Sequence, residues 1–568
     1  LGVVASGRVV ERLAADHPES LARLRARCAA GTVSPCGGRD TDSPLALLAA
    51  EELLDSFALG RAAWERHVGA APLTFARVAG GAAPLLPAVL GGLGYLGAVW
   101  PLFDGTALPD PGAARIRWEG AGEAAIDAVA RPPVDVREAR AILGLPERLG
   151  DAMDHDHVAV VTFARYAGTA SPWHGLLRRI GSWSDALGTF VTPDELFRRT
   201  AGAGTPVAFE PDAFPVPAPP AGSLDPLAAA VAAATAEARR LVAAADELQP
   251  RLAVAAAESP VEPPRPAAGP WPWSRRREPE LVLDNGLIRL EAHPRTGGLL
   301  SLRRPVDRTN RLSQQLALRT TRPAPGAGAA WETADERAEH GRMQAEAVAR
   351  VKTAAGDDCI ESRGRLLDAG GKPCGGFAQR MALVPGEPLA TLDLELSLDA
   401  AAAGPLWEHH VSCRFAWHEN EDVEVLRSLL TQAIVTERNR FTAPHFVLVR
   451  GGRAAGADDV AILTGGLPWH VRSTPHVLDT IVLGAAATAA TRRLAIGIGL
   501  SRPGDAALRL LAGRIPGAAA GPDHVRLTGG RVERAADGTQ RLAVGLLESA
   551  GRAGHVRIEW ARPPAAAQ

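Results

Sequence analysis

Hydrophobic and polar positions follow a different pattern in the two halves of the chain. In residues 281–302, apolar runs with strand-like alternation are separated by two turn sequences, Asp284-Asn285-Gly286 and His293 to Gly298. Further strands of this kind are expected at 389–398, 409–417, 446–450, 460–463, 493–500 and 541–547. We therefore expect residues 280–568 to form a β region of one or two β-sandwiches.

The first 204 residues instead alternate helical stretches with short apolar runs. Ser6 is placed to cap a first helix, residues 19–30 predict a second, and Ser43-Pro44 opens a long amphipathic third. Strands are expected at 72–76, 95–100 and 158–164. This alternation indicates an α/β layer, and we expect residues 1–204 to form a partial (β/α) barrel. No Gly-x-Gly-x-x-Gly follows a strand, which argues against a nucleotide-binding loop.

Two proline-rich connectors and a helical segment join these halves. The connectors are expected at 205–224 and 259–279. Between them, Asp225-Pro226 begins a short helical module that extends to residue 258. The chain is therefore expected to be multidomain, α/β followed by β.

Residues 84–103 are apolar enough to suggest a membrane span. The prolines and glycines within this run favour a short helix followed by a buried strand instead. Residues 1–10 contain one charge, Arg8, and no long apolar core, so we expect no signal peptide and favour a cytoplasmic location.

The charge and the cysteine content of the chain argue against several classes of binding partner and cofactor. A formal net charge of −2 argues against nucleic acid or an anionic membrane as the main partner. The five cysteines lack Cys-x-x-Cys spacing, so neither a disulfide framework nor a structural zinc site is expected.

Polar side chains follow several of the expected strands. In an α/β barrel, catalytic groups gather where the strands end, and the candidates there are Asp42, Arg77, Asp104, Trp118, Glu119, Arg165 and Tyr166. Carboxylates beside an aromatic ring suit a carbohydrate site, because carboxylates accept hydrogen bonds from hydroxyls and the ring stacks on a sugar face. Asp104 is the first candidate for a catalytic carboxyl group and Asp42 the second. The alternative is that Asp42 caps a helix and Asp104 belongs to a turn.

His155 and His157 have the residue type and spacing of zinc ligands. They precede the expected strand 158–164, and would therefore lie at its N-terminal end, away from the edge where barrel chemistry gathers. A solvated loop is the alternative for this pair.

Several stretches resemble glycoside hydrolase family 38, the α-mannosidases, in a divergent bacterial form. In the N-terminal half they are DHPESL at 16–21, GTV at 31–33 leading to Gly37-Gly38, DSPL at 42–45 leading to Gly60, and PLLPAVL at 84–90 before Gly94-Tyr95. In the β half they are NGLI at 285–288, GGLLSL at 297–302, GLPWH at 466–470 and VLDT at 477–480. The resemblance covers most of the chain.

This resemblance implies retaining hydrolysis of α-mannosides. One carboxylate forms a covalent glycosyl-enzyme, and a second carboxyl group acts as acid and then as base. The family also implies a carbohydrate partner and a zinc ion that holds sugar hydroxyls. By the same resemblance, His470 and Arg472 would lie near the barrel mouth as sugar contacts.

The family's catalytic pattern has few counterparts in this sequence. Its first zinc pair, His-x-Asp or His-x-His, would lie upstream of Leu1. Its nucleophile would fall near Val78, where no carboxylate stands, and residues 225–258 contain no histidine. The chain is therefore expected to be either a hydrolase of this kind or a homologue without catalysis that serves as a carbohydrate-binding or scaffold protein.

Overall fold

The computed structural model contains two compact units, residues 1–217 and 218–568. Within them the structure describes residues 1–77, 83–99, 113–120, 124–155, 159–166, 168–183, 188–208, 212, 225–248, 281–307, 309–321, 338–353, 356–402, 404–418, 423–451, 459–484, 486–514, 525–534 and 540–548. Side chains are described up to residue 514, except at 154, 155 and 244–248.

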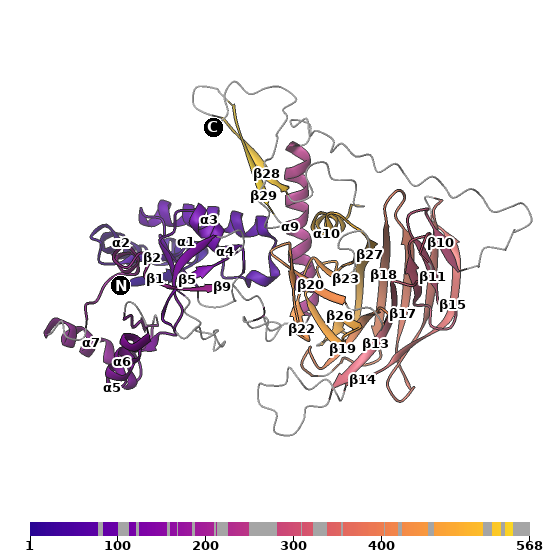
Figure 1. The fold of residues 1–568 in the computed structure, drawn as a ribbon, viewed down its shortest axis with the longest axis horizontal. Coiled ribbons are helices and arrows are strands. Elements are labelled where there is room, and N and C mark those ends of the chain that lie inside the picture. Colours follow the sequence, from indigo (N-terminus) through magenta and orange to yellow (C-terminus); the bar gives the residue numbers. More distant parts are fainter. Residues whose placement is uncertain are drawn as a thin grey trace, which may run out of the picture. The chain divides into compact units, whose positions relative to one another are not determined.

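Unit 1 is built on a seven-stranded sheet with the order β1-β2-β3-β4-β6-β5-β9 (Figure 1). The strands are Gly2–Ala5 (β1), Ser34–Gly37 (β2), Thr74–Ala76 (β3), Gly97–Val99 (β4), Arg115–Glu119 (β5), Ala125–Val129 (β6) and Thr205–Ala208 (β9). Strands β1 to β4 and β6 run parallel, whereas β5 is antiparallel to β6 and β9 is parallel to β5. The described strands thus form an open mixed sheet, and a closed barrel is not seen among them.

The main helices of unit 1 are α1 (Gly7–Asp16), α2 (Pro18–Ala29), η1 (Leu45–Leu47), α3 (Ala50–Val68), α4 (Leu86–Gly92) and α8 (Pro193–Arg199). Two of them, α1 and α8, begin at a side-chain cap that the sequence supplies. The Ser6 hydroxyl caps α1 by accepting from the backbone N–H of Val9, as predicted. Helix α1 packs closely on α3 because Gly7 and Gly60 meet without side chains.

A smaller module of unit 1 has its own apolar core. It contains β7 (Val134–Asp135), β8 (Phe163–Ala164), α5 (Arg140–Leu143), α6 (Leu145–His155) and α7 (Pro172–Trp183). Strand β8 pairs only with β7, so the prediction that 158–164 is a strand of the main sheet is wrong.

Three other predictions for this half are settled by the structure. The third helix begins at Ala50 and not at Ser43-Pro44, because η1 intervenes. Residues 205–208 form β9 of the sheet and are not part of a connector. The run 84–103 does contain a short helix, α4, followed by a strand, β4. In the part of the chain that the structure describes, no helix is both long and apolar enough to cross a membrane.

Unit 2 contains two nine-stranded antiparallel sheets. Sheet I has the order β10-β11-β12-β13-β19-β26-β25-β22, with β14 paired to β13. Its strands are Val282–Asp284 (β10), Arg289–Ala292 (β11), Leu299–Arg303 (β12), Leu312–Thr321 (β13), Ala338–His340 (β14), His409–Ala416 (β19), Arg440–Thr442 (β22), Trp469–Thr474 (β25) and Val477–Gly484 (β26).

Sheet II has the order β15-β16-β17-β18-β27-β24-β23-β20-β21. Its strands are Arg342–Lys352 (β15), Asp358–Leu367 (β16), Pro373–Leu383 (β17), Leu389–Leu398 (β18), Val423–Leu429 (β20), Gln432–Val435 (β21), Phe446–Gly451 (β23), Val460–Leu463 (β24) and Ala489–Ile498 (β27). The two sheets contact each other through buried side chains: Gln314 bonds to Gln379 at 3.1 Å, and the Ser362 hydroxyl donates to the Gly297 carbonyl at 2.9 Å. The predicted change from α/β to β at about residue 280 is therefore confirmed.

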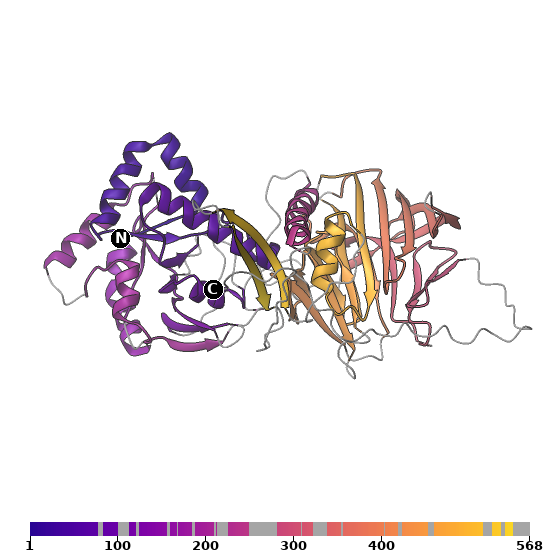
Figure 2. The ribbon, with the colours of Figure 1, turned by 90° about the horizontal axis from the view of Figure 1, so that it is seen from above.

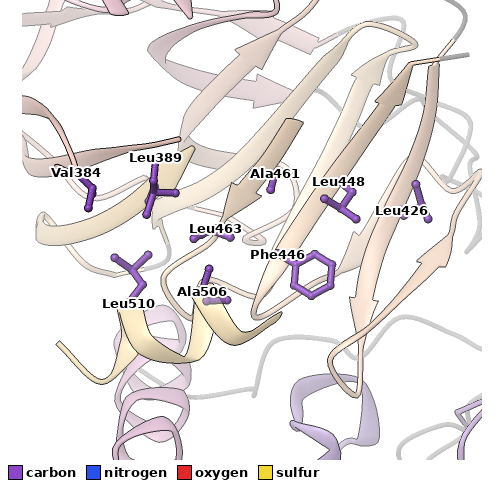
Figure 3. Packing of buried hydrophobic residues seen from close by; sticks show 11 residues of the cluster. Val384, Leu389, Leu426, Phe446, Leu448, Ala461, Leu463, Ala506 and Leu510 are labelled. Carbon is purple, nitrogen blue, oxygen red and sulfur yellow. The ribbon is translucent and has the colours of Figure 1, made fainter. Parts of the chain in front are cut away.

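Two helices and a hairpin complete unit 2. Helix α9 (Pro226–Leu248) lies beside α10 (Pro503–Leu511), and β28 (Val525–Arg534) pairs with β29 (Gln540–Glu548) (Figure 2). Figure 3 shows Ala506 and Leu510 of α10 against apolar side chains of sheet II, among them Leu389, Phe446 and Leu463. The described part of the predicted helical module 225–258 is thus one helix, α9. This helix belongs to unit 2.

Candidate functional site

The carboxyl ends of β2 and β3 bring two arginine side chains together. These strands are parallel neighbours, so the residues that follow them lie at one edge of the sheet. Arg39 Nη1 donates to the Ser43 carbonyl at 2.9 Å, and Arg77 Nη2 donates to the same oxygen at 2.8 Å. Arg39 Nη2 also donates to the Ser43 hydroxyl at 3.0 Å, and Arg77 Nη2 to the Asp42 carbonyl at 3.3 Å. Two guanidinium groups therefore hold the loop at 42–43 in place.

Both arginines are buried, with exposed fractions of 2% for Arg39 and 4% for Arg77. Burial lowers the pKa of Arg39 to about 10, while the nearby Asp42, Glu52 and Asp40 carboxylates act to raise it. Arg39 therefore stays charged at neutral pH. The edge thus combines two buried guanidinium groups with the nearby carboxylates of Asp40, Asp42 and Glu52.

Tyr95 belongs to the same edge, although no sequence pattern indicates a polar role for it. Its hydroxyl donates to the Gly37 carbonyl at 3.0 Å, and the Arg61 guanidinium lies 5.2 Å from the centre of its ring. Gly37 and Gly38 both have φ values in the left-handed region, +113° and +105°. A side chain at Gly38 would collide with the Tyr95 hydroxyl, so the Gly-Gly pair is the feature that could have revealed this contact.

Of the two predicted carboxylates, the structure describes Asp42. Its side chain is exposed beside Arg39 and Arg77. Pro44 and not Asp42 precedes the 3-10 helix η1, and α3 begins only at Ala50. The capping role that was its alternative explanation therefore does not apply to Asp42. Asp104 lies outside the described residues, so its role stays a prediction.

Trp118 and Glu119 do not reach this edge. They end β5, which runs antiparallel to β6 and hence opposite to β2, β3 and β4, so the prediction of a common edge is wrong for them. Glu119 is exposed, but Trp118 is 1% exposed and packs in the core. The direction of β5 is the reason that these residues lie away from the edge formed by β2 and β3. The buried indole of Trp118 also offers no open face to a sugar.

Arg165 and Tyr166 follow β8 and therefore belong to the smaller module, not to the main sheet. The Tyr166 ring lies 4.3 Å from the Arg137 guanidinium carbon, and Arg137 pairs with Asp135. This side chain has a local packing role on the module. Arg165 is exposed.

His470 and Arg472 lie on β25 of unit 2. His470 is fully buried, and its Nδ1 and Nε2 lie 3.1 Å from Thr480 Oγ1 and 3.0 Å from the Ala443 carbonyl. The ring is also stacked on Phe441 at 5.5 Å, and burial lowers its pKa to about 4. Both ring nitrogens are thus satisfied inside the protein, which contradicts a direct sugar contact by His470. Arg472 Nη2 donates to the Pro475 carbonyl at 3.1 Å.

The predicted metal pair is only partly visible. His155 is the last residue of α6 and its side chain is not described, whereas His157 lies outside the described residues. Within the described ranges no group of three His, Cys, Asp or Glu side chains could hold a metal ion. At the edge of unit 1, the carboxylates share their space with the Arg39 and Arg77 guanidiniums, which would repel a dication. The described residues of this edge therefore do not fit a zinc site.

The elements described above define a class of protein: an α/β unit, one long helix, and a unit of two large antiparallel sheets. No family model matches the sequence. No curated protein matches it either.

Solved structures with this arrangement do exist. An α-mannosidase from Enterococcus faecalis V583 matches with a TM-score of 0.63 at 8% identity, covering 96% of this chain and 89% of that one. A protein in glycosyl hydrolase family 38 from Enterococcus faecalis matches with a TM-score of 0.53 at 9% identity, covering 97% of this chain and 90% of that one. The resemblance seen in the sequence is therefore confirmed as a shared fold, in both units and in the same order.

Proposed function

We propose that this chain is a carbohydrate-active protein on the α-mannosidase fold that recognises an α-mannoside or a related glycan. The observation that carries the proposal is the match over 96% of the chain to an α-mannosidase, which includes both units. The proposed sugar site is the edge of unit 1 where Arg39, Arg77 and Asp42 meet. Asp42 is exposed there and can accept from sugar hydroxyls, while the buried Arg39 and Arg77 hold its loop in place.

In the catalytic form of this proposal, Asp42 and Asp104 are the carboxyl groups of a retaining glycosidase. One would form the glycosyl-enzyme, and the other would protonate the leaving oxygen and then activate water. Arg39 and Arg77 would hold the loop that carries Asp42 in position. Zinc belongs to the same family expectation, and the donor set at this edge gives it no support.

The second form is a homologue without catalysis that binds a glycan. The pair of buried arginines favours it, because two fixed positive charges stand where a zinc-dependent site would need neutral or anionic ligands. Binding would then rest on hydrogen bonds to the exposed Asp42 and its loop, which the arginines hold in place.

Two measurements on the purified chain separate these forms. Calorimetry with methyl α-D-mannopyranoside measures binding, and release of nitrophenol from an aryl α-mannoside, with and without chelator, measures hydrolysis. Turnover lost in both Asp42→Asn and Asp104→Asn would support catalysis, with Asp40→Asn as the matched control. Binding without turnover would support the second form, and absence of both would refute the proposal.

Arg77→Leu tests the location of the site in either form. We expect at least a tenfold loss of mannoside affinity, because the buried Arg77 fixes residues 42–43 and with them the exposed Asp42. Arg12→Leu on the exposed side of α1 is the control and should bind as the unaltered chain does. Equal affinity of the two variants would place the sugar elsewhere.

A further inference from the structure

Three basic side chains meet on the smaller module of unit 1, away from the edge that carries Asp42 (Figure 1). Phe163 of β8 packs in the module core with Trp173 of α7. Arg165 comes two residues after Phe163, so the alternation of an extended segment places it on the same side, toward α7. His174 directly follows Trp173, and Arg178 is one helical turn further along α7. The fold therefore gathers Arg165, His174 and Arg178 where β8 leads into α7.

The opposite side of the two strands carries a separate polar group. The Tyr166 ring lies 4.3 Å from the Arg137 guanidinium carbon, and Arg137 pairs with Asp135. Tyr166 and Arg165 are neighbours in the chain and therefore point to opposite sides. The carboxylate of Asp135 is thus committed to Arg137 and does not neutralise Arg165.

The three gathered side chains form a group of like charge. Burial lowers the pKa of His174, and the positive charges of Arg165 and Arg178 lower it further. No carboxylate among the described residues acts on this ring. In the part of the chain that the structure describes, neither Arg165 nor Arg178 makes an ion pair or a side-chain hydrogen bond. Like charges at this spacing repel one another, and an anion placed among them would remove the repulsion.

The group is also open to a solute. Arg165 and Arg178 are both exposed, and His174 is partly exposed. In this respect the group differs from Arg39 and Arg77, which are buried and bonded to the backbone of residues 42–43. The donors of Arg165 and Arg178 face water, so a ligand can replace that water.

The charge of the group indicates the chemistry of its ligand. Two guanidinium groups exclude a cation, whereas their paired N–H donors match the oxygens of a carboxylate or a phosphate. A carboxylate brings one negative charge, but a phosphate monoester brings nearly two at neutral pH. The second charge also favours the protonated form of His174, which then becomes a third cationic donor. A phosphate monoester therefore uses all three side chains.

We propose that Arg165, His174 and Arg178 bind a phosphate monoester group, either as free phosphate or as the phosphate of a sugar. The two arginines donate to the phosphate oxygens, and His174 adds a proton and a further hydrogen bond. The proposal does not depend on the sugar site at the edge of unit 1. It also gives Arg165 a role on the smaller module, where its neighbours are α7 and not the main sheet.

The test follows the protonation of His174 in the full chain labelled with ¹⁵N-histidine. The signals of this ring are identified by their loss in His174→Gln. At constant ionic strength, inorganic phosphate should raise the midpoint of the His174 titration by about 0.5–1 pH unit relative to sodium chloride. We expect α-D-mannose 1-phosphate to do the same and methyl α-D-mannopyranoside to have no effect. Tighter binding of the sugar phosphate than of inorganic phosphate would identify a phosphorylated sugar as the ligand, and equal or weaker binding would identify free phosphate.

Single substitutions of the exposed arginines locate the site. Arg165→Gln and Arg178→Gln each remove one charged donor and should weaken phosphate binding roughly two- to fivefold. Arg179→Gln is the matched control, because Arg179 is equally exposed and loses the same charge but does not act on His174. It should bind phosphate as the unaltered chain does.

Two results would overturn the proposal. The first is a His174 midpoint that saturating phosphate does not move. The second is an equal loss of affinity in Arg178→Gln and Arg179→Gln, because phosphate would then be attracted only by the net charge of α7. Since the signal comes from His174, the test remains decisive even if the edge of unit 1 binds no mannoside.

Discussion

The fully buried histidines His410 and His470 illustrate how the surroundings of a side chain determine its pKa. Both rings lie on sheet I, and burial lowers the pKa of His410 to about 3 and of His470 to about 4. The unfolded chain binds protons at both rings near pH 6.5, well before the folded chain does. The stability linked to each neutral ring is therefore fully present above pH 6.5 and is lost as the pH falls toward the folded value.

We predict that unit 2 becomes less stable between pH 6.5 and 4. Each ring contributes a slope of about 1.4 kcal/mol per pH unit to the free energy of unfolding, and the two together about twice that. Chemical denaturation at pH 7, 6 and 5 measures this slope. His470→Leu should reduce the slope by half, whatever it does to stability at pH 7. A free energy of unfolding that does not change over this range would contradict the assignment of both rings as neutral.

At the residue scale, the polar residues that directly follow predicted strands were the most useful guide to candidate functional side chains in the sequence. The rule that functional groups follow parallel strands identified Asp42 and Arg77, which the structure brings to one loop. The same rule misplaced Trp118, since the short segment RIRWE at 115–119 does not indicate the direction in which its strand runs. The family resemblance placed His470 at a sugar site, whereas its ring is buried by partners that lie 10 and 27 residues away in the sequence.

At the scale of elements, the packing of α3 positions the candidate sugar edge. Gly60 of α3 lies against the backbone of Gly38 and Arg39, and a Cβ at position 60 would overlap the Arg39 carbonyl group. The Arg39 carbonyl also accepts from the backbone N–H of Gly7 at 2.8 Å. The loop that carries Arg39 is thus fixed by two helices at once.

We predict that Gly60→Ala lowers the stability of unit 1 by about 1–3 kcal/mol, because the added methyl group must displace backbone. The same change should weaken mannoside affinity by moving Arg39. Gly91→Ala in α4 is the matched control: its Cβ would meet nothing within 4 Å, so up to about 1 kcal/mol of stabilisation is expected from helix propensity. Thermal unfolding and sugar binding measured on both variants check this. If Gly60→Ala and Gly91→Ala had the same stability and the same mannoside affinity, α3 would be able to shift without displacing the loop that carries Arg39.

The sequence predicted whether a segment is a helix or a strand better than it predicted which strands pair with one another. Strand β18 at Leu389–Leu398 coincides with apolar alternation, because one of its faces is partly exposed. Strand β24 at Val460–Leu463 coincides with a continuous apolar run, because all of its residues are buried. By contrast, β9 begins at Thr205 inside a proline-rich run, and its pairing with β5 came from tertiary contact. The predicted start of α3 at Ser43-Pro44 is wrong because η1 at Leu45–Leu47 intervenes, and α3 begins at Ala50.

At the scale of the whole molecule, each unit has an apolar core of its own. In unit 1, Val10, Leu21, Trp64 and Val68 form one buried cluster. In unit 2, Leu510 of α10 belongs to a cluster with Leu389 and Leu463 of sheet II (Figure 3). Because apolar burial is the main stabilising term, a change in one of these clusters should act on the unit that contains it.

We therefore predict two heat-absorption transitions in calorimetry of the full chain. Leu510→Ala removes buried methyl groups and should lower one of them, with a loss of about 2–5 kcal/mol. Gly60→Ala should lower the other and leave the first in place. Val306→Ala is the control for Leu510→Ala, because Val306 is 81% exposed and its truncation should move neither transition. A single transition lowered by both Leu510→Ala and Gly60→Ala would show instead that the two cores unfold as one cooperative body.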